Sequence, residues 1–249
     1  MSNRNFRDWI GRMLSLGVPH EQFPLLQPTS DVDSLQHEAW VRRVLKEAQK
    51  NHHDLNTPLS DITFLILDTE TTGFNPHEGD QIISIAAAKT LNGNIVDMYS
   101  SHINPQRDIP PAISELTGIS NRDVEQAPLL EEEIKNILSY IENDVIVGYH
   151  INHDISFLNY FLLKNYRSKL KQQIIELRQI SEAINGNSFP SLDHALSYYS
   201  ISSNERHTAT GDVKVMVQLW QNLLNQFSDN KIVTLHDLYF FLSIRKSLY

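Results

Sequence analysis

Two carboxylates separated by one residue, Asp68 and Glu70, follow directly after an apolar run at residues 62–67. The run is rich in β-branched and large apolar side chains, which is typical of a buried strand. Because side chains alternate along a strand, both carboxylates lie on one face, just past its apolar part. Neighbouring carboxylates repel each other unless a positive charge lies between them, and hard divalent cations prefer such oxygen ligands. On this stretch alone, a cation site and a plain acidic turn are equally good interpretations.

Two later segments each place a carboxylate at the border of a predicted helix. Asp154 follows a short apolar strand at residues 145–148, and a capping role alone would explain it. Asp212 lies in the first turn of a predicted helix that begins near Ala209, and His207 precedes Asp212 by five positions. A lone histidine in a loop is usually only solvated. Together, however, four carboxylates without any cysteine suit Mg²⁺ or Mn²⁺, and a nearby histidine suits a general base.

These segments resemble the DEDD exonuclease superfamily in its histidine-containing, DnaQ-like (DEDDh) subclass. This subclass includes the proofreading epsilon subunit of bacterial DNA polymerase III, ribonuclease T and oligoribonuclease. The resemblance is carried by Asp-Thr-Glu-Thr-Thr-Gly from Asp68, Asp-Ile-Ser-Phe-Leu from Asp154 and His-Thr-Ala-Thr-Gly-Asp from His207. A loop within residues 103–119 is also similar. The resemblance covers roughly residues 60–227 and implies an α/β, ribonuclease H-like fold with a mixed central sheet flanked by helices.

The resemblance implies hydrolysis of phosphodiester bonds from the 3′ end of a nucleic acid, with release of nucleoside monophosphates. Asp68, Glu70, Asp154 and Asp212 would hold two divalent cations, Mg²⁺ or Mn²⁺, one to activate a water and one to stabilise the leaving 3′ oxygen. His207 would take the proton of that water. The residues implied to contact the substrate are Thr69, Thr71, Thr72, Gly73, Leu116, Thr117, Tyr149, His150 and Phe157.

The sequence departs from the family pattern just before Asp154. The family usually has His-Asn five and four positions before this carboxylate and an aromatic residue directly before it. This chain has Tyr149, His150 and His153 at those positions. Tyr149 and His150 still have groups that can donate hydrogen bonds to a phosphate or hold Asp154. The departure therefore bears on the grip on the substrate more than on the chemistry.

The rest of the pattern predicts three consecutive strands, followed by helices that alternate with single strands. Asn92-Gly93, between extended runs at residues 81–90 and 95–103, is a strong hairpin signal. This order predicts a mixed sheet covered by helices. The remaining expected elements are short helical turns at residues 112–116 and 121–126, strands at 145–148 and 174–177, and helices at 129–142, 154–164, 192–199, 209–227 and 235–247.

Length and composition favour one sizeable domain with appendages, because 41% of the 249 residues are hydrophobic. Residues 1–60 are interpreted as a helical extension and linker, with helices at 6–14 and 34–50. Residues 61–228 are interpreted as the exonuclease domain, and residues 229–249 as a C-terminal helix packed on it. The absence of cysteine excludes disulfides, thiolate metal sites and a cysteine nucleophile.

The charge and hydropathy of the chain limit its partners. A net charge of −9 argues against a protein that coats nucleic acid, but not against an enzyme that grips a short strand locally. No apolar run approaches the ~18 residues that a membrane span needs. No export signal is evident, which predicts a cytoplasmic protein without a membrane partner.

Three alternatives to a DNA exonuclease stay open. A ribonuclease that trims RNA ends or short oligonucleotides fits equally well, because discrimination depends on contacts near the sugar 2′ position. A catalytically silent binding module is disfavoured, because all five catalytic residues are present. The third is a proofreader bound to a polymerase or sliding clamp. Residues 22–26, Gln-Phe-Pro-Leu-Leu, loosely resemble a clamp-binding peptide, although packing of their apolar side chains on the core would also explain them.

Overall fold

The computed structural model describes residues 30–203 and 206–246, and the chain divides into two units at the border between Trp40 and Val41. Helix α2 (Ser30–Lys50) crosses this border and begins a turn earlier than the predicted residue 34. In the second unit its Val41, Leu45 and Ala48 are buried. The helix predicted at residues 6–14 and the clamp-like segment at 22–26 lie outside the described residues.

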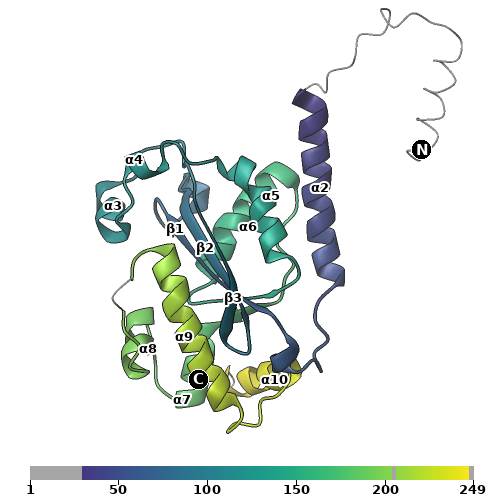
Figure 1. The fold of residues 1–249 in the computed structure, drawn as a ribbon, viewed down its shortest axis with the longest axis vertical. Coiled ribbons are helices and arrows are strands. Elements are labelled where there is room, and N and C mark those ends of the chain that lie inside the picture. Colours follow the sequence, from purple (N-terminus) through teal and green to yellow (C-terminus); the bar gives the residue numbers. More distant parts are fainter. Residues whose placement is uncertain (1–29, 204–205, 247–249) are drawn as a thin grey trace, which may run out of the picture. The chain divides into compact units, whose positions relative to one another are not determined.

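The second unit is built on a five-stranded mixed sheet with the strand order β3-β2-β1-β4-β5 (Figure 1). The first three strands are consecutive and antiparallel, whereas the last two run parallel to β1. Asn92 and Gly93 join β2 to β3 with φ values of 52° and 74°, the left-handed conformation that a tight hairpin turn needs. The strands are β1 (Phe64–Thr71), β2 (Ile82–Leu91), β3 (Asn94–His102), β4 (Val145–Gly148) and β5 (Ile174–Glu176).

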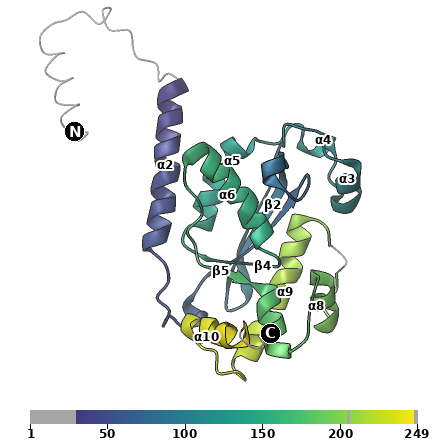
Figure 2. The ribbon, with the colours of Figure 1, turned by 180° about the vertical axis from the view of Figure 1, so that it is seen from behind.

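Helices cover both faces of this sheet (Figures 1 and 2). Helix α9 (Ala209–Phe227) contacts β1, β2 and β3 on one face, and α5 and α6 cover the other. Among the described residues, no helix is both long and apolar enough to cross a membrane. The other helices and 3₁₀ turns are η2 (Leu59–Asp61), η3 (Pro76–Glu78), α3 (Pro111–Thr117), α4 (Asn121–Val124), α5 (Leu130–Ile141), α6 (Asn152–Tyr166), α7 (Leu177–Asn185), α8 (Leu192–Tyr198) and α10 (Leu235–Lys246).

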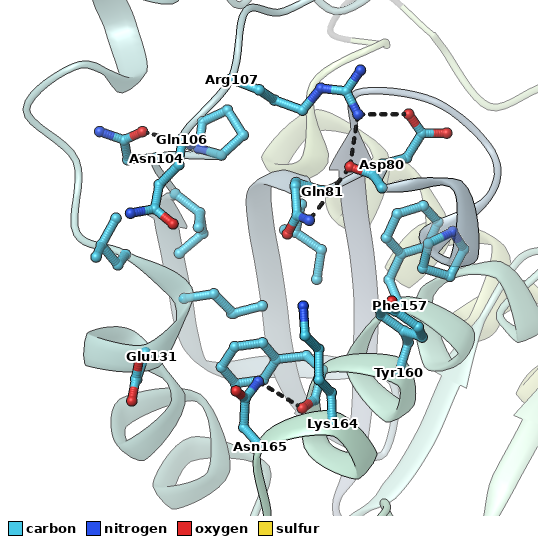
Figure 3. Close-up of a pocket in the computed structure, with 18 residues that line it drawn as sticks. Asp80, Gln81, Asn104, Gln106, Arg107, Glu131, Phe157, Tyr160, Lys164 and Asn165 are labelled. Atoms are coloured by element: carbon cyan, nitrogen blue, oxygen red, sulfur yellow. Dashed lines mark hydrogen bonds and ion pairs between the residues drawn. The ribbon is translucent and has the colours of Figure 1, made fainter. Parts of the chain in front are cut away.

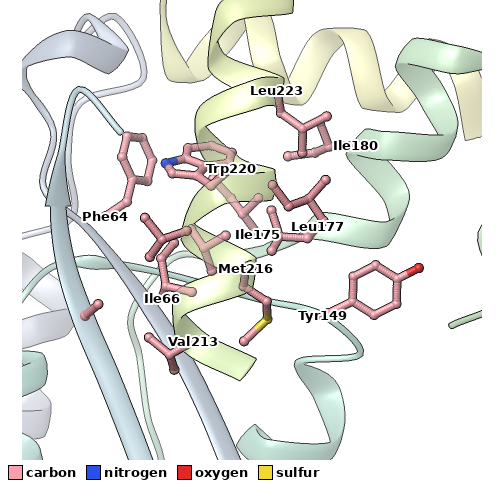
Figure 4. Close-up of a cluster of buried hydrophobic side chains, with 14 of the residues drawn as sticks. Phe64, Ile66, Tyr149, Ile175, Leu177, Ile180, Val213, Met216, Trp220 and Leu223 are labelled. Atoms are coloured by element: carbon pink, nitrogen blue, oxygen red, sulfur yellow. The ribbon is translucent and has the colours of Figure 1, made fainter. Parts of the chain in front are cut away.

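The core between β1 and α9 determines which way the acidic residues face (Figure 4). Phe64 and Trp220 are almost fully buried, and their rings meet edge to face with centroids 4.8 Å apart. Ile66 lies in the same cluster. Because side chains alternate along β1, Asp68 and Glu70 lie on this α9 face, just beyond the apolar part of the strand.

Helix α7 is absent from the sequence-based prediction, which extended a strand to residue 177. In the structure, β5 ends at Glu176, whose side chain accepts a hydrogen bond from the Arg178 backbone N–H and caps the new helix. Leu177 and Ile180 are buried in the core next to α9. Gly186, at φ 68°, ends the helix in the left-handed conformation that favours glycine.

Candidate active site

Three of the four predicted carboxylates converge at the end of β1. Asp68 and Glu70 project from the strand, and Asp212 lies in the first turn of α9. One carboxylate oxygen from each residue lies within 4.8 Å of the others. The Thr208 side chain caps α9 by accepting a hydrogen bond from the Gly211 N–H at 3.0 Å, which places Asp212 at the start of the helix. The three side chains are close enough to share one cation.

Asp154 ties helix α6 to the same end of β1. Its Oδ1 accepts hydrogen bonds from the Thr69 N–H at 2.7 Å and from the Thr69 hydroxyl at 2.6 Å. Asp154 is 4% exposed and is not one of the three converging carboxylates. Its charge nevertheless raises the pKa of Asp68 and of Glu70, so it belongs to the same electrostatic cluster.

Burial and mutual repulsion make this cluster costly to ionise. Burial raises the pKa of Asp68 well above its ordinary value, and the charges of Asp154, Asp212 and Glu70 raise it further. Burial, followed by the charges of Asp212 and Asp154, raises the pKa of Glu70 to about 7. Burial also raises the pKa of Asp154 to about 7. A buried set of repelling oxygen ligands without sulfur fits hard divalent cations such as Mg²⁺ or Mn²⁺.

His207 lies in the loop before α9 and is fixed to the cluster through its backbone. Its N–H donates a hydrogen bond to Asp212 Oδ1 at 3.2 Å. Its φ of 68° is uncommon for a residue other than glycine. The side chain is exposed, so water can reach the imidazole. The five-residue spacing therefore has a structural cause, because this turn brings the loop back onto the carboxylate of Asp212.

Arg206 also belongs to the site, although the sequence analysis did not identify it. Its Nη1 lies 2.5 Å from Asp212 Oδ1, and its Nε donates to Asp193 Oδ1 on α8 at 2.9 Å. The positive charge of Arg206 lowers the pKa of Asp68, Glu70 and Asp212, against the larger effect of burial. No residue spacing indicates the contact with Asp193, because Asp193 and Arg206 lie on different elements. The place of Arg206 directly before His207, six positions before Asp212, was the available signal for the contact with Asp212.

The turn after β1 explains the glycine of the motif. A Cβ atom at Gly73 would lie 2.3 Å from Asp80 Oδ2, so the site has no room for a side chain there. Asp80 in turn accepts hydrogen bonds from the Asn75 N–H at 3.0 Å and from the Thr72 hydroxyl at 3.3 Å. The Thr71 hydroxyl donates to the Gly73 carbonyl at 2.6 Å. These contacts hold the turn in one conformation beside Glu70.

Most of the side chains predicted to contact the substrate are buried or already hydrogen-bonded. The Thr117 hydroxyl donates to the Ile113 carbonyl at 2.9 Å, and Phe157 is 3% exposed. The Tyr149 hydroxyl points out of the core cluster (Figure 4) and donates to the carbonyls of Phe189 and Ser191 at 2.5 and 2.9 Å. Of the nine predicted contact residues, only Leu116 and His150 have exposed side chains. Contact with the substrate stays a prediction for all nine.

An exposed aromatic residue that the sequence analysis did not select lies next to the motif. Phe74 directly follows Gly73 and is 83% exposed. Its ring centroid lies 6.1 Å from that of His153. An exposed ring beside such a turn can stack on a nucleic-acid base. Its position immediately after the motif was the available sequence signal that Phe74 lies beside the site.

A separate cavity of about 420 Å³ lies between α6, the turn before β2 and the segment after β3 (Figure 3). Lys164 and Gln81 point into it, and Arg107 lies at its edge, 3.5 Å from Asp80. Phe157 forms part of its wall. None of the five predicted catalytic residues lines this cavity, so it is distinct from the acidic cluster.

Comparisons with known proteins match the chain to nucleases. The family described as Exonuclease (RNase T) matches residues 65–220. The DNA polymerase III subunit epsilon-like protein of Rhodobacter capsulatus is 32% identical over 173 residues, covering 68% of this chain and 24% of the relative. The 3′-5′ exonuclease DinG of Bacillus subtilis is 29% identical over 180 residues, covering 70% of this chain and 19% of the relative. The chain thus spans a quarter or less of the length of these two relatives.

A solved structure shows the same fold. The zinc-bound complex of Escherichia coli exonuclease I with single-stranded DNA has a TM-score of 0.60 and 18% identity, covering 72% of this chain and 43% of that chain. This likeness, together with the sheet order, confirms the predicted α/β architecture. A polymerase or sliding-clamp partner stays a prediction.

Proposed function

The chain belongs to the exonuclease family, as its motifs predicted, and we propose that it is a metal-dependent 3′-5′ exonuclease that releases nucleoside monophosphates from single-stranded DNA or DNA 3′ ends. The observation that carries the proposal is the convergence of Asp68, Glu70 and Asp212 within 4.8 Å. The direction of cleavage is supported by the name of the Bacillus subtilis relative. The preference for DNA is supported by the name of the Rhodobacter capsulatus relative and by the DNA bound to exonuclease I.

The four carboxylates are proposed to hold two divalent cations, Mg²⁺ or Mn²⁺. Such cations supply an acidified water and neutralise charge that develops on the scissile phosphate. Asp68, Glu70 and Asp212 converge, while Thr69 keeps Asp154 at the edge of the cluster. When ionised, these four negative charges face one nearby guanidinium among the described residues, that of Arg206. Residues 30–203 and 206–246 therefore leave most of the negative charge of the site uncompensated, which favours cation binding.

His207 is proposed as the general base. Its exposed imidazole can accept a proton from water, and its backbone hydrogen bond to Asp212 holds the loop beside the acidic cluster. A positioned base contributes about 10²–10⁴-fold to a rate. Because His207 is not one of the four carboxylates, its loss should separate turnover from cation binding.

Two exposed apolar side chains are proposed to position the terminal nucleotides. Leu116, on α3, is 51% exposed, and Phe74, after the catalytic turn, is 83% exposed. Contacts with the faces of bases tolerate any sequence, because every base presents an aromatic face. We therefore expect degradation with little sequence preference.

A degradation ladder tests the proposal. Single-stranded DNA and RNA of equal sequence, labelled at the 5′ end, are incubated with the protein in Mg²⁺, in Mn²⁺ and in chelator. Stepwise shortening of DNA that needs a cation is expected. The variant Asp68→Asn should be inactive, whereas the matched control Asp97→Asn, at an exposed position on β3, should keep the activity.

Three results of this experiment would overturn parts of the proposal. Shortening that persists in chelator or in Asp68→Asn would contradict the role of the acidic cluster. Faster degradation of RNA than of DNA would contradict the proposed substrate and favour RNA trimming. The absence of shortening of either substrate in both cations would contradict the exonuclease activity itself.

A further inference from the structure

Arg206 bridges two carboxylates that belong to different helices. Its Nη1 lies 2.5 Å from Asp212 Oδ1 in the acidic cluster, and its Nε donates to Asp193 Oδ1 at 2.9 Å. The Arg206 side chain is 12% exposed, whereas that of Asp193 is 55% exposed. The guanidinium therefore has one partner inside the cluster and one at the surface of α8.

The same oxygen of Asp212 also accepts a hydrogen bond from the His207 N–H, at 3.2 Å. Asp212 Oδ1 is thus shared between Arg206 and the loop of the proposed general base. The Arg206 charge reaches beyond Asp212, because it also lowers the pKa of Asp68 and of Glu70. No other lysine or arginine in the described part of the chain has such an effect on these three carboxylates.

A divalent cation at the cluster and the guanidinium of Arg206 compete for the same negative charge. A cation bound by Asp212 repels the guanidinium of Arg206. It also takes up carboxylate lone pairs of Asp212 that accept the hydrogen bond from Arg206. Asp193 offers Arg206 a second charge-assisted hydrogen bond outside the cluster. A partner of this kind lowers the cost of moving Arg206 away from Asp212.

We propose that Arg206 is the resident counter-charge of the acidic cluster, held on Asp212 when no divalent cation is bound and drawn toward Asp193 when one binds. Arg206 and Asp193 are then positioning residues that set the affinity of the cluster for cations. The inference rests on the proposed metal site and goes beyond it, because neither side chain is one of the proposed metal ligands.

The proposal predicts opposite effects for its two partners. Arg206→Gln removes the competitor, so the full chain should bind Mn²⁺ severalfold more tightly than wild type. Asp193→Asn removes the alternative partner and leaves Arg206 on Asp212, so Mn²⁺ should bind severalfold more weakly. Calorimetric titration of Mn²⁺ into each protein, without nucleic acid, measures both effects. Arg178→Gln is the matched control, because Arg178 forms a similar ion pair with Glu182 at 3.0 Å and should leave the affinity unchanged.

Thermal unfolding supplies an independent readout. In chelator, Arg206→Gln should unfold at a lower temperature than wild type, because the carboxylates lose their counter-charge. In saturating Mn²⁺ this difference should disappear. A variant that had only lost packing would be destabilised in both conditions, which would contradict the proposal.

The outcomes separate this inference from the proposed function. If wild type binds Mn²⁺ and Asp193→Asn binds it with the same affinity, the inference is overturned and the metal site still stands. Wild type that does not bind Mn²⁺ overturns the metal site and the inference with it. If Arg206→Gln does not fold, the sign of the change in Asp193→Asn still decides, and tighter binding there contradicts the proposal.

Discussion

The two ends of strand β1 carry clusters of charge that are built differently. At the start of the strand, Leu65 pairs with Lys89, whose ammonium lies 3.0 Å from Glu142 and 3.1 Å from Asp144. These two carboxylates share the positive charge of the Lys89 ammonium. At the far end, Asp68, Glu70 and Asp212 converge, and Asp212 contacts the guanidinium of Arg206.

The difference shows that charge balance, rather than burial alone, distinguishes the candidate site. Burial raises the pKa of Asp144, as it does at the other end, but Lys89 lowers that pKa through a direct contact. At the candidate site, the neighbours of Asp68 are mostly other carboxylates, and they raise its pKa further. Perturbed acids occur in structural ion pairs as well as in functional sites. An excess of like charge points to a ligand that is supplied from outside.

Removal of one carboxylate at each end should give the largest contrast. Glu70→Gln is expected to abolish Mn²⁺ binding and metal-dependent cleavage, because Glu70 is one of the three converging ligands. Glu142→Gln makes the same change at the other end and should leave cleavage unchanged. Calorimetry and a single-turnover assay measure the two properties. Equal cleavage activity of the two variants would contradict the proposed difference between the two ends of β1.

Loss of the proposed base should affect turnover alone. His207→Gln is expected to slow cleavage by about 10²–10⁴-fold, because the water loses its proton acceptor. Mn²⁺ binding should be retained, since His207 contacts Asp212 through its backbone N–H. His77→Gln, at an exposed histidine on η3, is a suitable control. A variant with the wild-type rate would contradict the assignment of the base.

The metal-free protein should lose stability as the pH rises. The pKa of Glu70 rises from 4.5 to about 7 on folding, and that of Asp154 from 3.8 to about 7. Between the ordinary values and about 7, the folded protein holds protons that the unfolded chain has released, so stability falls as the pH rises through this window. Thermal unfolding in chelator at several pH values measures this dependence. Stability that increases steadily from about pH 5 to about pH 7, within this window, would contradict it.

The smallest effect is expected from the balanced end. Lys89→Gln leaves Asp144 without its counter-charge and should lower the free energy of unfolding by about 1–3 kcal/mol. Cleavage should be unaffected, and Mn²⁺ should not restore the lost stability. Denaturant unfolding with and without Mn²⁺ tests this prediction. Rescue by Mn²⁺ would show that two carboxylates at this end also bind a cation.

Local pattern was sufficient to predict most of the fold. The apolar run before Asp68, the Asn92-Gly93 turn and the apolar stripe of α9 through Trp220 each determine one element, and the structure contains all three. Helix α7 was missed because Leu177 continues the apolar character of β5. The spacing from Leu177 to Ile180 and the glycine at position 186 were the signals for that helix.

The pattern of the motifs could not predict how the site is supported. Arg206 meets Asp193, 13 residues earlier in the chain, and no periodicity links the two. The Tyr149 hydroxyl donates a hydrogen bond to the carbonyl of Phe189, 40 residues away. Such contacts depend on how separate helices pack against the sheet, so they require the three-dimensional structure. The acidic residues stand in local motifs, whereas contacts such as those of Arg206 with Asp193 and of Lys89 with Glu142 join separate elements.

The central claim is that the end of β1 holds more carboxylates than the positive charge of the described residues can balance. Thermal unfolding of Asp68→Asn and wild type, in chelator and in saturating Mg²⁺, tests this claim most directly. The account predicts that Asp68→Asn is the more stable protein in chelator, because a carboxyl group that is costly to ionise in the folded state is gone. It predicts that wild type is the more stable protein in Mg²⁺, because only wild type retains the complete cation site. A variant that is less stable than wild type in both conditions would contradict the account.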